Sequence, residues 1–506
     1  MAGSQWVALD RRTVAVTGLL VAGGCAGAAV LATYWITRVT SFGNALLWVL
    51  STAVLVVAAS CVIDHVRWRR TRCRITPERV ELHTGVFISR RRSLHRDRVR
   101  TVDVTADPLL RVFGLVQVLV GTGEQSGSDG SVRLRPVTRQ VAEELRRTLL
   151  DRTTDVTADG SLARLDPAWI RYAPLSLLTP LLGGGAFGVG LNVADWFGMQ
   201  DGVIGWAIAL FRGVPLVTTV VVLAAVVLVI GVAGSLGLFV EMWWSYRLDR
   251  EPGGTLRVRR GLLTTRSISL EERRLRGVEI VEPLGARLAG AARVDAVATG
   301  MVAPSEKDKT DHRTLLPAAP RAVANRVAAG VLREPDASPT SIRLTAHPVT
   351  ARSRRLRWAV GTTAVPVAVL VVLGLLLTEA LLHVAWIAAL VLLPAAVLLA
   401  LDAYRSLGHG LTPEYLVARS GTTRRATVAL KRAGIIGWTA KQSIFQRNAG
   451  LVTISATTAA GSGAYSILDV GVSDGLIVAE RAVPDLLTPF LQVTKPRLDE
   501  GAPVSR

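Results

Sequence analysis

Two arginine runs are the residues of this sequence whose charge and spacing point most directly to chemistry. The stretch 90-RRRSLHRDRVRTV-102 holds six arginines and one histidine, and 67-RWRRTRCR-74 directly follows an apolar segment. Guanidinium groups bind phosphate and carboxylate groups, so these runs indicate an anionic surface, a nucleic acid, or a solvated strand without a ligand. The residues that we assign to possible contact with anionic lipid are Arg67, Arg69, Arg70, Arg72, Arg90, Arg91, Arg92, Arg96 and Arg98.

The sequence contains none of the catalytic and metal-binding motifs that its histidines, cysteines and glycines could form. Its seven histidines lack metal-ligand spacing, and the glycine-rich stretch 121-GTGEQSG-127 lacks the lysine and following helix of a phosphate-binding loop. The three cysteines, Cys25, Cys61 and Cys73, show no disulfide or metal pattern. We therefore expect no catalytic residue, no cofactor and no metal. Nucleic acid is not an expected partner, because no stacking aromatic residues accompany the arginines.

The composition indicates a membrane protein with polar domains. Half of the 506 residues are hydrophobic, only 5% are aromatic, and the formal net charge is +20. The mean hydropathy of +0.38 is high for a soluble chain. Arginine supplies nearly all the positive charge, a bias that GC-rich codon usage also produces, so the charge alone does not favour nucleic acid.

Six apolar segments are long enough to cross a bilayer, which needs about 20 residues. They form three pairs, at 14–34 and 45–63, at 173–193 and 214–240, and at 358–377 and 384–401. The first segment also resembles a signal peptide, but its length and the second segment soon after it favour a span. Arginines gather outside the pairs and are scarce in the loops within them, which predicts cytoplasmic termini and cytoplasmic polar segments in the plasma membrane.

The polar segments after the three pairs share a spacing of four residues, which predicts an internal repeat. A glycine is followed by a leucine nine residues on, an arginine seventeen later and a glycine three later, without gaps. The aligned positions are Gly85, Leu94, Arg111 and Gly114, then Gly261, Leu270, Arg287 and Gly290, then Gly421, Leu430, Arg447 and Gly450.

Each polar segment reads as several short strands followed by one helix. Residues 98–105 and 115–122 alternate or run apolar as strands do, and 107-DPLLRVFG-114 predicts a short helix capped by Asp107 and ended by Gly114. Closing helices are predicted at 139–150, 321–332 and 485–494. This order is typical of a small barrel or sandwich closed by a C-terminal helix.

The first segment resembles the bacterial pleckstrin-homology (PH) domain membrane proteins. The resemblance rests on 76-TPERVELHTGVF-87 and 94-LHRDRVRTVDVTADPLLRVFGLVQVLVGT-122, and the third segment keeps 412-TPEYLVARSG-421 and 447-RNAGLVTIS-455. The second segment departs from it, with 251-EPGG-254 at the turn. The resemblance implies a strongly bent seven-stranded sheet closed by a C-terminal helix, and no known catalytic activity.

The predicted fold is therefore a polytopic α-helical membrane protein with six spans in three hairpins and three cytoplasmic PH-like β-barrel or sandwich domains. The hairpins are expected within 1–66, 168–240 and 350–404, and the PH-like domains within 67–155, 241–335 and 405–495.

The function that fits this organisation is that of a non-enzymatic scaffold. Its domains would dock a protein partner or a second copy, and would also touch the lipid bilayer, since PH-like sheets accept a peptide strand at an edge. The alternatives are a component of membrane transport or export, or a protein of envelope stress and antimicrobial resistance. The centres of the spans carry no charged residue, which disfavours ion-coupled transport.

Overall fold

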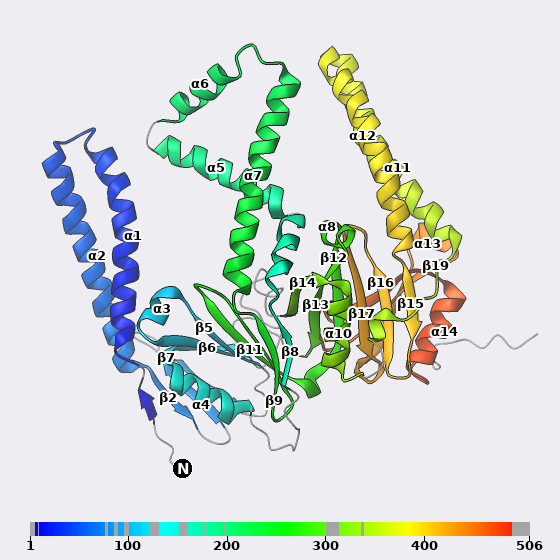
Figure 1. Cartoon of the computed structure of the whole chain (residues 1–506), viewed down its shortest axis with the longest axis horizontal. Helices are drawn as coiled ribbons and strands as arrows, with labels where there is room; N and C mark the ends of the chain where they lie inside the picture. The colour runs from blue at the N-terminus through cyan, green and yellow to red at the C-terminus, as the bar shows by residue number, and fades with distance from the viewer. Residues whose placement is uncertain are drawn as a thin grey trace, which may run out of the picture. The chain divides into compact units, whose positions relative to one another are not determined.

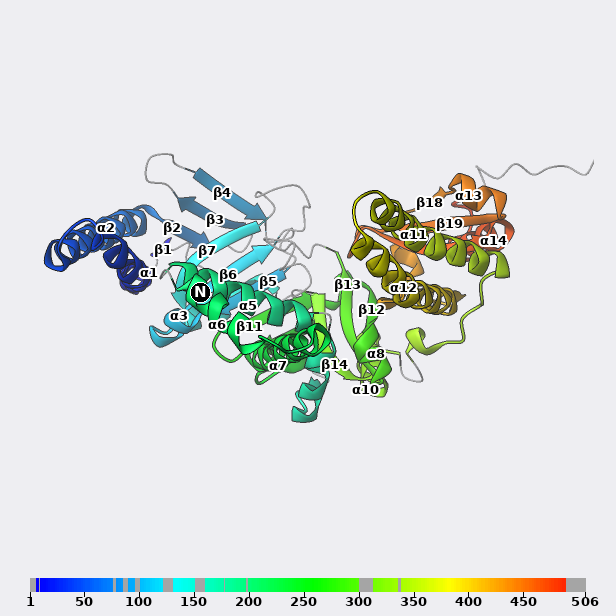
Figure 2. The same ribbon diagram turned by 90° about the horizontal axis from the view of Figure 1, so that it is seen from above.

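The computed structural model describes residues 6–8, 10–75, 79–84, 90–95, 101–121, 131–150, 160–176, 178–196, 199–299, 313–334 and 338–487. The chain forms two compact units, unit 1 (Met1–Ser341) and unit 2 (Ile342–Arg506). Figures 1 and 2 show that each unit combines long helices with antiparallel sheets.

Five helices among the described residues are long and apolar enough to cross a membrane. They are α1 (Arg12–Ile36), α2 (Phe42–Arg70), α7 (Leu216–Trp243), α11 (Val349–Leu376) and α12 (Glu379–Arg405). Their apolar side chains are largely exposed, as expected where lipid replaces water as the surrounding medium. Helix α1 packs on α2, and α11 packs on α12, as the predicted hairpins require. The chain is therefore a membrane protein.

The predicted third span is a bent pair of helices. The 3-10 helix η3 (Pro167–Leu175) and α5 (Leu178–Trp196) meet at an angle of 72°, and only if they count as one span does the total reach six. Pro174, inside η3, has no backbone N–H to continue a regular helix. A further helix, α6 (Gln200–Leu210), stands where the sequence predicted a loop. Six spans therefore stay a prediction.

Two glycines let α5 and α7 approach each other closely. A Cβ atom built on Gly183 would lie 2.0 Å from the carbonyl oxygen of Val227, and one built on Gly231 would lie 2.1 Å from that of Thr179. The pairs Gly23 with Gly27 and Gly184 with Gly188, which have the spacing of close helix contacts, have nothing within 4 Å of such an atom among the described residues. Close packing here depends on which face meets the neighbouring helix, which spacing alone does not fix.

The four-stranded sheet of unit 1 comes from the start of the chain. Its order is β1-β2-β3-β4, and every pair is antiparallel. The strands are β1 (Trp6–Ala8), β2 (Arg72–Ile75), β3 (Arg79–Thr84) and β4 (Arg90–His95).

A seven-stranded antiparallel sheet joins segments that follow two different hairpins. Its order is β7-β6-β5-β11-β10-β9-β8. The strands are β5 (Thr101–Ala106), β6 (Leu115–Gly121), β7 (Ser131–Thr138), β8 (Gly160–Arg164), β9 (Arg247–Glu251), β10 (Thr255–Arg260) and β11 (Thr265–Glu271).

Two strand pairs join these segments: β8 pairs with β9, and β5 pairs with β11 in a register that runs from Ala106 opposite Thr265 to Thr101 opposite Leu270. Strands from the two predicted domains 67–155 and 241–335 thus share one sheet. The domain boundaries themselves stay predictions.

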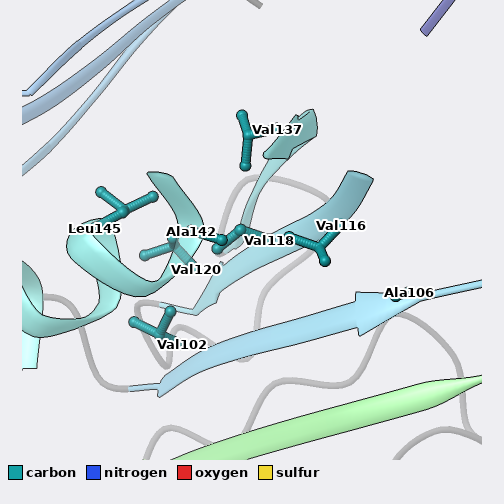
Figure 3. Packing of buried hydrophobic residues seen from close by; sticks show 8 residues of the cluster. All are labelled: Val102, Ala106, Val116, Val118, Val120, Val137, Ala142 and Leu145. Carbon is teal, nitrogen blue, oxygen red and sulfur yellow. The ribbon is translucent and has the colours of Figure 1, made fainter. Parts of the chain in front are cut away.

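Valines of β5 and β6 form the core under helix α4 (Arg139–Leu150). Val102, Val118 and Val120 are fully buried and meet Ala142 and Leu145 of the helix (Figure 3). The alternation of these valines places them on one face of the sheet, and the apolar face of the helix covers them. Both the strand at 115–122 and the closing helix at 139–150 are confirmed.

Unit 1 ends with a third antiparallel ladder, in which β13 (Ala291–Ala298) pairs with both β12 (Leu275–Pro283) and β14 (Thr314–Pro320). Helix α10 (Arg321–Leu332) packs against it, as predicted for 321–332. Short helices complete the unit, at η4 (Glu272–Arg274), α8 (Leu284–Leu288) and η5 (Pro339–Ser341).

Unit 2 holds two antiparallel ladders. They contain β15 (Gly408–Leu411), β16 (Tyr415–Ser420) and β17 (Arg424–Lys431), and β18 (Gly437–Lys441), β19 (Leu451–Thr457) and β20 (Ala464–Gly471). The short helices η6 (Arg432–Gly434) and α13 (Ile444–Asn448) lie between strands.

The closing helix of unit 2 is α14 (Val472–Ala482), so the prediction of a helix beginning at 485 is wrong. Asp485 has a φ of 63°, which does not continue a helix, and residues 488–494 lie outside the described residues. Gly475 hides the helical pattern in the sequence, but Ala479 and Ala482 are buried against the strands.

The aligned repeat positions have matching geometry. Gly114, Gly290 and Gly450 end the short helices α3 (Pro108–Val112), α8 and α13 with φ values of 71°, 71° and 64°. Leu270 and Leu430 are buried, whereas Leu94 and Gly85 belong to positions whose side chains or backbone are not described. Asp107 precedes α3 without a capping hydrogen bond, whereas Ser443 forms a full capping box with Gln446 before α13.

Replacing Gly231 by alanine should separate α5 from α7. The added methyl group would meet the carbonyl of Thr179, and overpacking of this kind costs about 1–3 kcal/mol. The matched control is Gly237→Ala on the same helix, where nothing lies within 4 Å. Thermal unfolding of the detergent-purified protein should show a lower midpoint for Gly231→Ala alone. Equal midpoints for the two variants would contradict the close contact.

Candidate functional site

An arginine-lined pocket of about 450 Å³ opens in unit 1 where strands from the two segments meet. Its apolar floor includes Val104, Leu115 and Val116. Its rim includes Trp244, which directly follows the membrane helix α7. Six guanidinium groups and one carboxylate line it: Arg111, Arg139, Arg257, Arg259, Arg260, Arg266 and Glu143.

A tight turn places two of these arginines opposite each other. Gly261 has a φ of 112°, and a Cβ atom there would lie 2.0 Å from the carbonyl oxygen of Thr264, so the turn requires glycine. The turn folds β11 back on β10 and places Arg260 opposite Arg266. Gly421, the aligned residue of the third segment, has a φ of 101° and the same close approach, to Arg424.

Arg257 joins the two segments through carboxylates. Its Nη2 lies 3.0 Å from Oε2 of Glu143 on α4, and its Nη1 lies 2.9 Å from Oε1 of Glu251 on β9. Its Nε donates to the Ser267 hydroxyl at 2.8 Å. Because the side chain is only 8% exposed, these partners offset the cost of burying its charge.

The other arginines leave the pocket with an excess of positive charge. Burial, and then repulsion from Arg257, lowers the pKa of Arg259, although Glu251 partly offsets both effects. The guanidinium carbon of Arg260 lies 4.3 Å from the ring centre of Trp243, a cation–π contact. Arg111 donates to the carbonyl of Leu262 at 2.7 Å. An anion bound here would relieve the repulsion, so the geometry favours a carboxylate or phosphate ligand.

Among the arginines singled out in the sequence, the three whose side chains are described do not line this pocket. Arg67, Arg69 and Arg70 are exposed in the last turn of α2, where cations interact favourably with the helix dipole. Arg72 lies on β2, and Arg90, Arg91 and Arg92 lie on β4, with side chains outside the described part of the chain. Arg96 and Arg98 also lie outside the described residues. Lipid contact by these nine residues stays a prediction.

Sequence reasoning missed most of the pocket. Only Arg111 is identified, as a repeat position, although apolar and basic residues alternate in 256-LRVRR-260. That alternation places Arg257 and Arg259 on one face of β10, so the signal existed. The sequence does not show that β5 pairs with β11. This pairing brings α4 and its Glu143 to that face.

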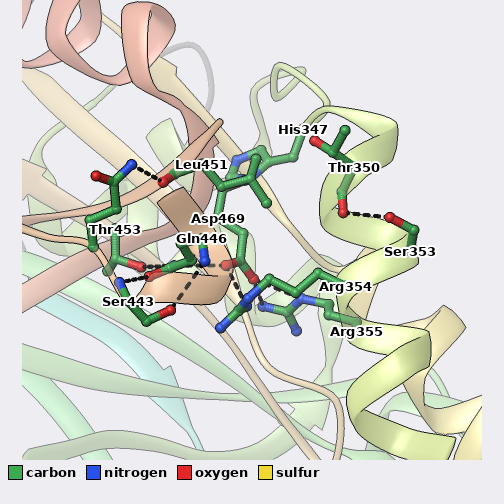
Figure 4. Close-up of polar contacts among 11 residues, drawn as sticks. His347, Thr350, Ser353, Arg354, Arg355, Ser443, Gln446, Leu451, Thr453 and Asp469 are labelled. Carbon is green, nitrogen blue, oxygen red and sulfur yellow. Dashed lines mark hydrogen bonds and ion pairs between the residues drawn. The ribbon is translucent and has the colours of Figure 1, made fainter. Parts of the chain in front are cut away.

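A second polar cluster, in unit 2, fixes membrane helix α11 to the strands. Asp469 of β20 is buried, and its Oδ1 accepts from Arg354 at 2.6 Å and from the Gln446 amide at 2.9 Å (Figure 4). Its Oδ2 accepts from Nε of Arg355 at 3.1 Å. Both arginines stand in the first two turns of α11, so one carboxylate ties the start of this membrane helix to the strands and to α13.

A buried histidine pair adjoins this cluster. Nε2 of His347 lies 3.0 Å from Nδ1 of His409, and Nδ1 of His347 lies 3.2 Å from the carbonyl oxygen of Asp469. Burial, and then repulsion from His409, lowers the pKa of His347 to about 4, against the weaker opposing effect of Asp469. Burial also lowers the pKa of His409, despite the nearby charge of Asp474. Both rings are therefore neutral near pH 7.

The described residues contain no group of three or more histidine, cysteine or acidic side chains that could hold a metal ion.

Replacing Asp469 by asparagine should destabilise unit 2 strongly. Asparagine tolerates the φ of 54°, so the change removes charge while leaving Arg354 and Arg355 partly buried without their carboxylate. Breaking a buried ion pair from one side costs about 3–5 kcal/mol. The control is Asp485→Asn, an exposed aspartate with a φ of 63°. Denaturant unfolding in detergent measures both, and a loss below about 1 kcal/mol for Asp469→Asn would show that the carboxylate anchors nothing.

Acid should destabilise unit 2 through the histidine pair. The pKa of His347 is lower in the fold, about 4, than its ordinary value of 6.5, so only the unfolded chain takes up the proton between these values. Stability is complete above about pH 6.5 and falls toward pH 4, by up to roughly 3 kcal/mol. His347→Gln should flatten this part of a stability–pH profile, whereas His383→Gln, at an exposed ring, should leave it. A profile unchanged by His347→Gln would refute the assignment.

Comparison with known proteins assigns two ranges of the chain to a protein family. A family model described as "Bacterial PH domain" matches residues 18–153 and 365–481, which together make up half of the chain. Each matched range covers all or part of a predicted hairpin and the strand-rich segment after it. No curated protein and no solved structure matches the chain.

Proposed function

Since this chain belongs to the bacterial PH domain family, we propose that it is a non-enzymatic membrane scaffold whose tandem PH-like modules dock a protein partner at the cytoplasmic face of the cell membrane. The arginine-lined pocket of unit 1 is the observation that carries the proposal. It would receive an acidic segment of the partner.

The charge of the pocket supports docking. Among the described residues its lining combines six guanidinium groups with one carboxylate, Glu143, which is paired with Arg257, so it offers charge complementarity to an acidic ligand. Charge complementarity chiefly gives specificity and a fast encounter, as a docking surface needs. The rim beside α7 keeps the bound segment near the bilayer.

The modular plan gives the scaffold its three parts. Matching turns at Gly261 and Gly421, and matching helix ends at Gly114, Gly290 and Gly450, support three tandem units, each preceded by a membrane hairpin. The arginines at the cytoplasmic end of α2 would hold the first module against anionic lipid. The scarcity of arginine in the loops within the predicted hairpins supports a cytoplasmic location for both termini.

Charge reversal in the pocket tests the proposal. The wild-type protein should capture a partner from native membranes by crosslinking and pull-down. Arg259→Glu combined with Arg139→Glu should abolish this capture. Both side chains are exposed, so the fold should persist. Arg326→Glu, on the exposed face of α10, is the control. Expected partner yields fall at least tenfold for the pocket variant and stay unchanged for the control.

A parallel arm separates protein from lipid. The same variants are reconstituted and tested for enrichment of anionic over neutral phospholipid around the protein. Unchanged protein capture with lost lipid enrichment would make the pocket a lipid site and overturn the docking proposal. No effect in either assay would shift weight to the transport alternative, which a flux assay would then address.

A further inference from the structure

Two edge strands, one from the first repeated segment and one from the third, occupy the same repeat positions as two strands that pair with each other in unit 1. Strand β4 is the last strand of the sheet β1-β2-β3-β4, and β18 is the first strand of the ladder β18-β19-β20. Among the described residues, neither has a strand on its outer side. Such edges present unpaired backbone N–H and carbonyl groups to a further strand.

The repeat alignment relates these edges to β5 and β11. Aligned on Gly114 and Gly450, β18 occupies the positions of the first five residues of β5. Aligned on Gly85 and Gly261, β4 occupies the positions of the last six residues of β11. In unit 1, β5 of one segment pairs with β11 of the next. Strands β4 and β18 are thus the aligned counterparts of β11 and β5 that have no strand on that side among the described residues.

The free edge of β18 is accessible. Thr439, Ala440 and Lys441 are exposed, and this strand pairs with β19 on its other side. Its sequence keeps the apolar alternation of β5, with Trp438 and Ala440 at the positions of Val102 and Val104. Strand addition at such an edge is a common mode of recognition, with affinity from the main chain.

We propose that β18 of one molecule pairs antiparallel with β4 of a second copy of this chain, as β5 pairs with β11 within one chain. The register follows from the aligned pair, which places Leu94 opposite Gly437, Arg92 opposite Thr439, and Arg90 opposite Lys441. The two surfaces differ, so the contact is heterologous and joins copies head to tail in the plane of the membrane.

The register also predicts how charge controls the assembly. Arg90 and Lys441 are like charges at opposed positions, and like charges directly across a sheet are unfavourable. The cations of β4 thus limit the length of the array, as charged residues do on other exposed edges. Assembly should strengthen when Lys441 becomes acidic.

Cysteine crosslinking between two differently tagged full-length chains tests the pairing. In a background with Cys25, Cys61 and Cys73 replaced by serine or alanine, one chain carries Arg92→Cys and the other Thr439→Cys. Opposed residues of an antiparallel pair have Cα atoms about 4.5–5.5 Å apart, within the range for a disulfide. Mild oxidation of native membranes should give a disulfide-linked species that contains both tags.

Matched pairs separate specific pairing from collision. Arg92→Cys with Ala464→Cys, which lies on β20 away from the β18 edge, should give at least tenfold less product. Thr105→Cys with Arg266→Cys in one chain should form the internal disulfide that the register of β5 and β11 requires, which verifies folding in the same membranes. Lys441→Glu should raise the yield of the two-tag species severalfold, and Lys441→Arg should leave it unchanged.

Two results would overturn the proposal. The first is the absence of the two-tag species while the internal disulfide forms. The second is a disulfide between Arg92→Cys and Thr439→Cys only when both stand in one chain, which would mean that the chain satisfies its own edges. Neither result depends on the arginine-lined pocket, so the docking proposal is tested separately.

Discussion

The backbone pairing of β5 with β11 is the interaction on which the organisation of unit 1 depends. It makes one sheet from strands that follow different membrane hairpins, so the two segments share one structural unit. The valine core under α4 and the arginine-lined pocket both lie against this sheet. Because main-chain hydrogen bonds do not depend on side-chain identity, the pairing tolerates the very different charges that the aligned segments carry.

Buried charge joins different elements of the fold in both units. In unit 2, Asp469 receives two arginines from the start of α11, and in unit 1 Arg257 receives two carboxylates from different segments. Each cluster stands where an apolar helix or sheet meets polar chain. A buried ion costs several kcal/mol to desolvate, so each demands its partners in one geometry.

A scaffold interpretation unites these features without a catalytic step. In the proposed scaffold, the membrane helices confine the modules to a surface and the pocket supplies charge. The edges of β4 and β18, which have no outer strand among the described residues, supply backbone groups. Restriction to the membrane raises the effective concentration of copies and partners, so each individual contact can stay weak. The neutral histidine pair beside Asp469 limits the pH range over which unit 2 is stable, because protonation of the pair in acid lowers the stability of the fold.

The sequence by itself determined the class of protein, five of the membrane helices, strands β5 and β6, and two of the three closing helices. Hydropathy and alternation are local properties, and a span or a half-buried strand displays them directly. It misplaced the last helix, because Gly475 interrupts the pattern that burial of Ala479 and Ala482 sustains. Only the tertiary structure decided which arginines converge. Arg257 and Glu143 stand 114 residues apart, and no local signal reports that β5 turns to a later segment for its neighbour. Arg67, Arg69 and Arg70, prominent in the sequence, do not line the pocket, because convergence depends on strand pairing and not on charge density.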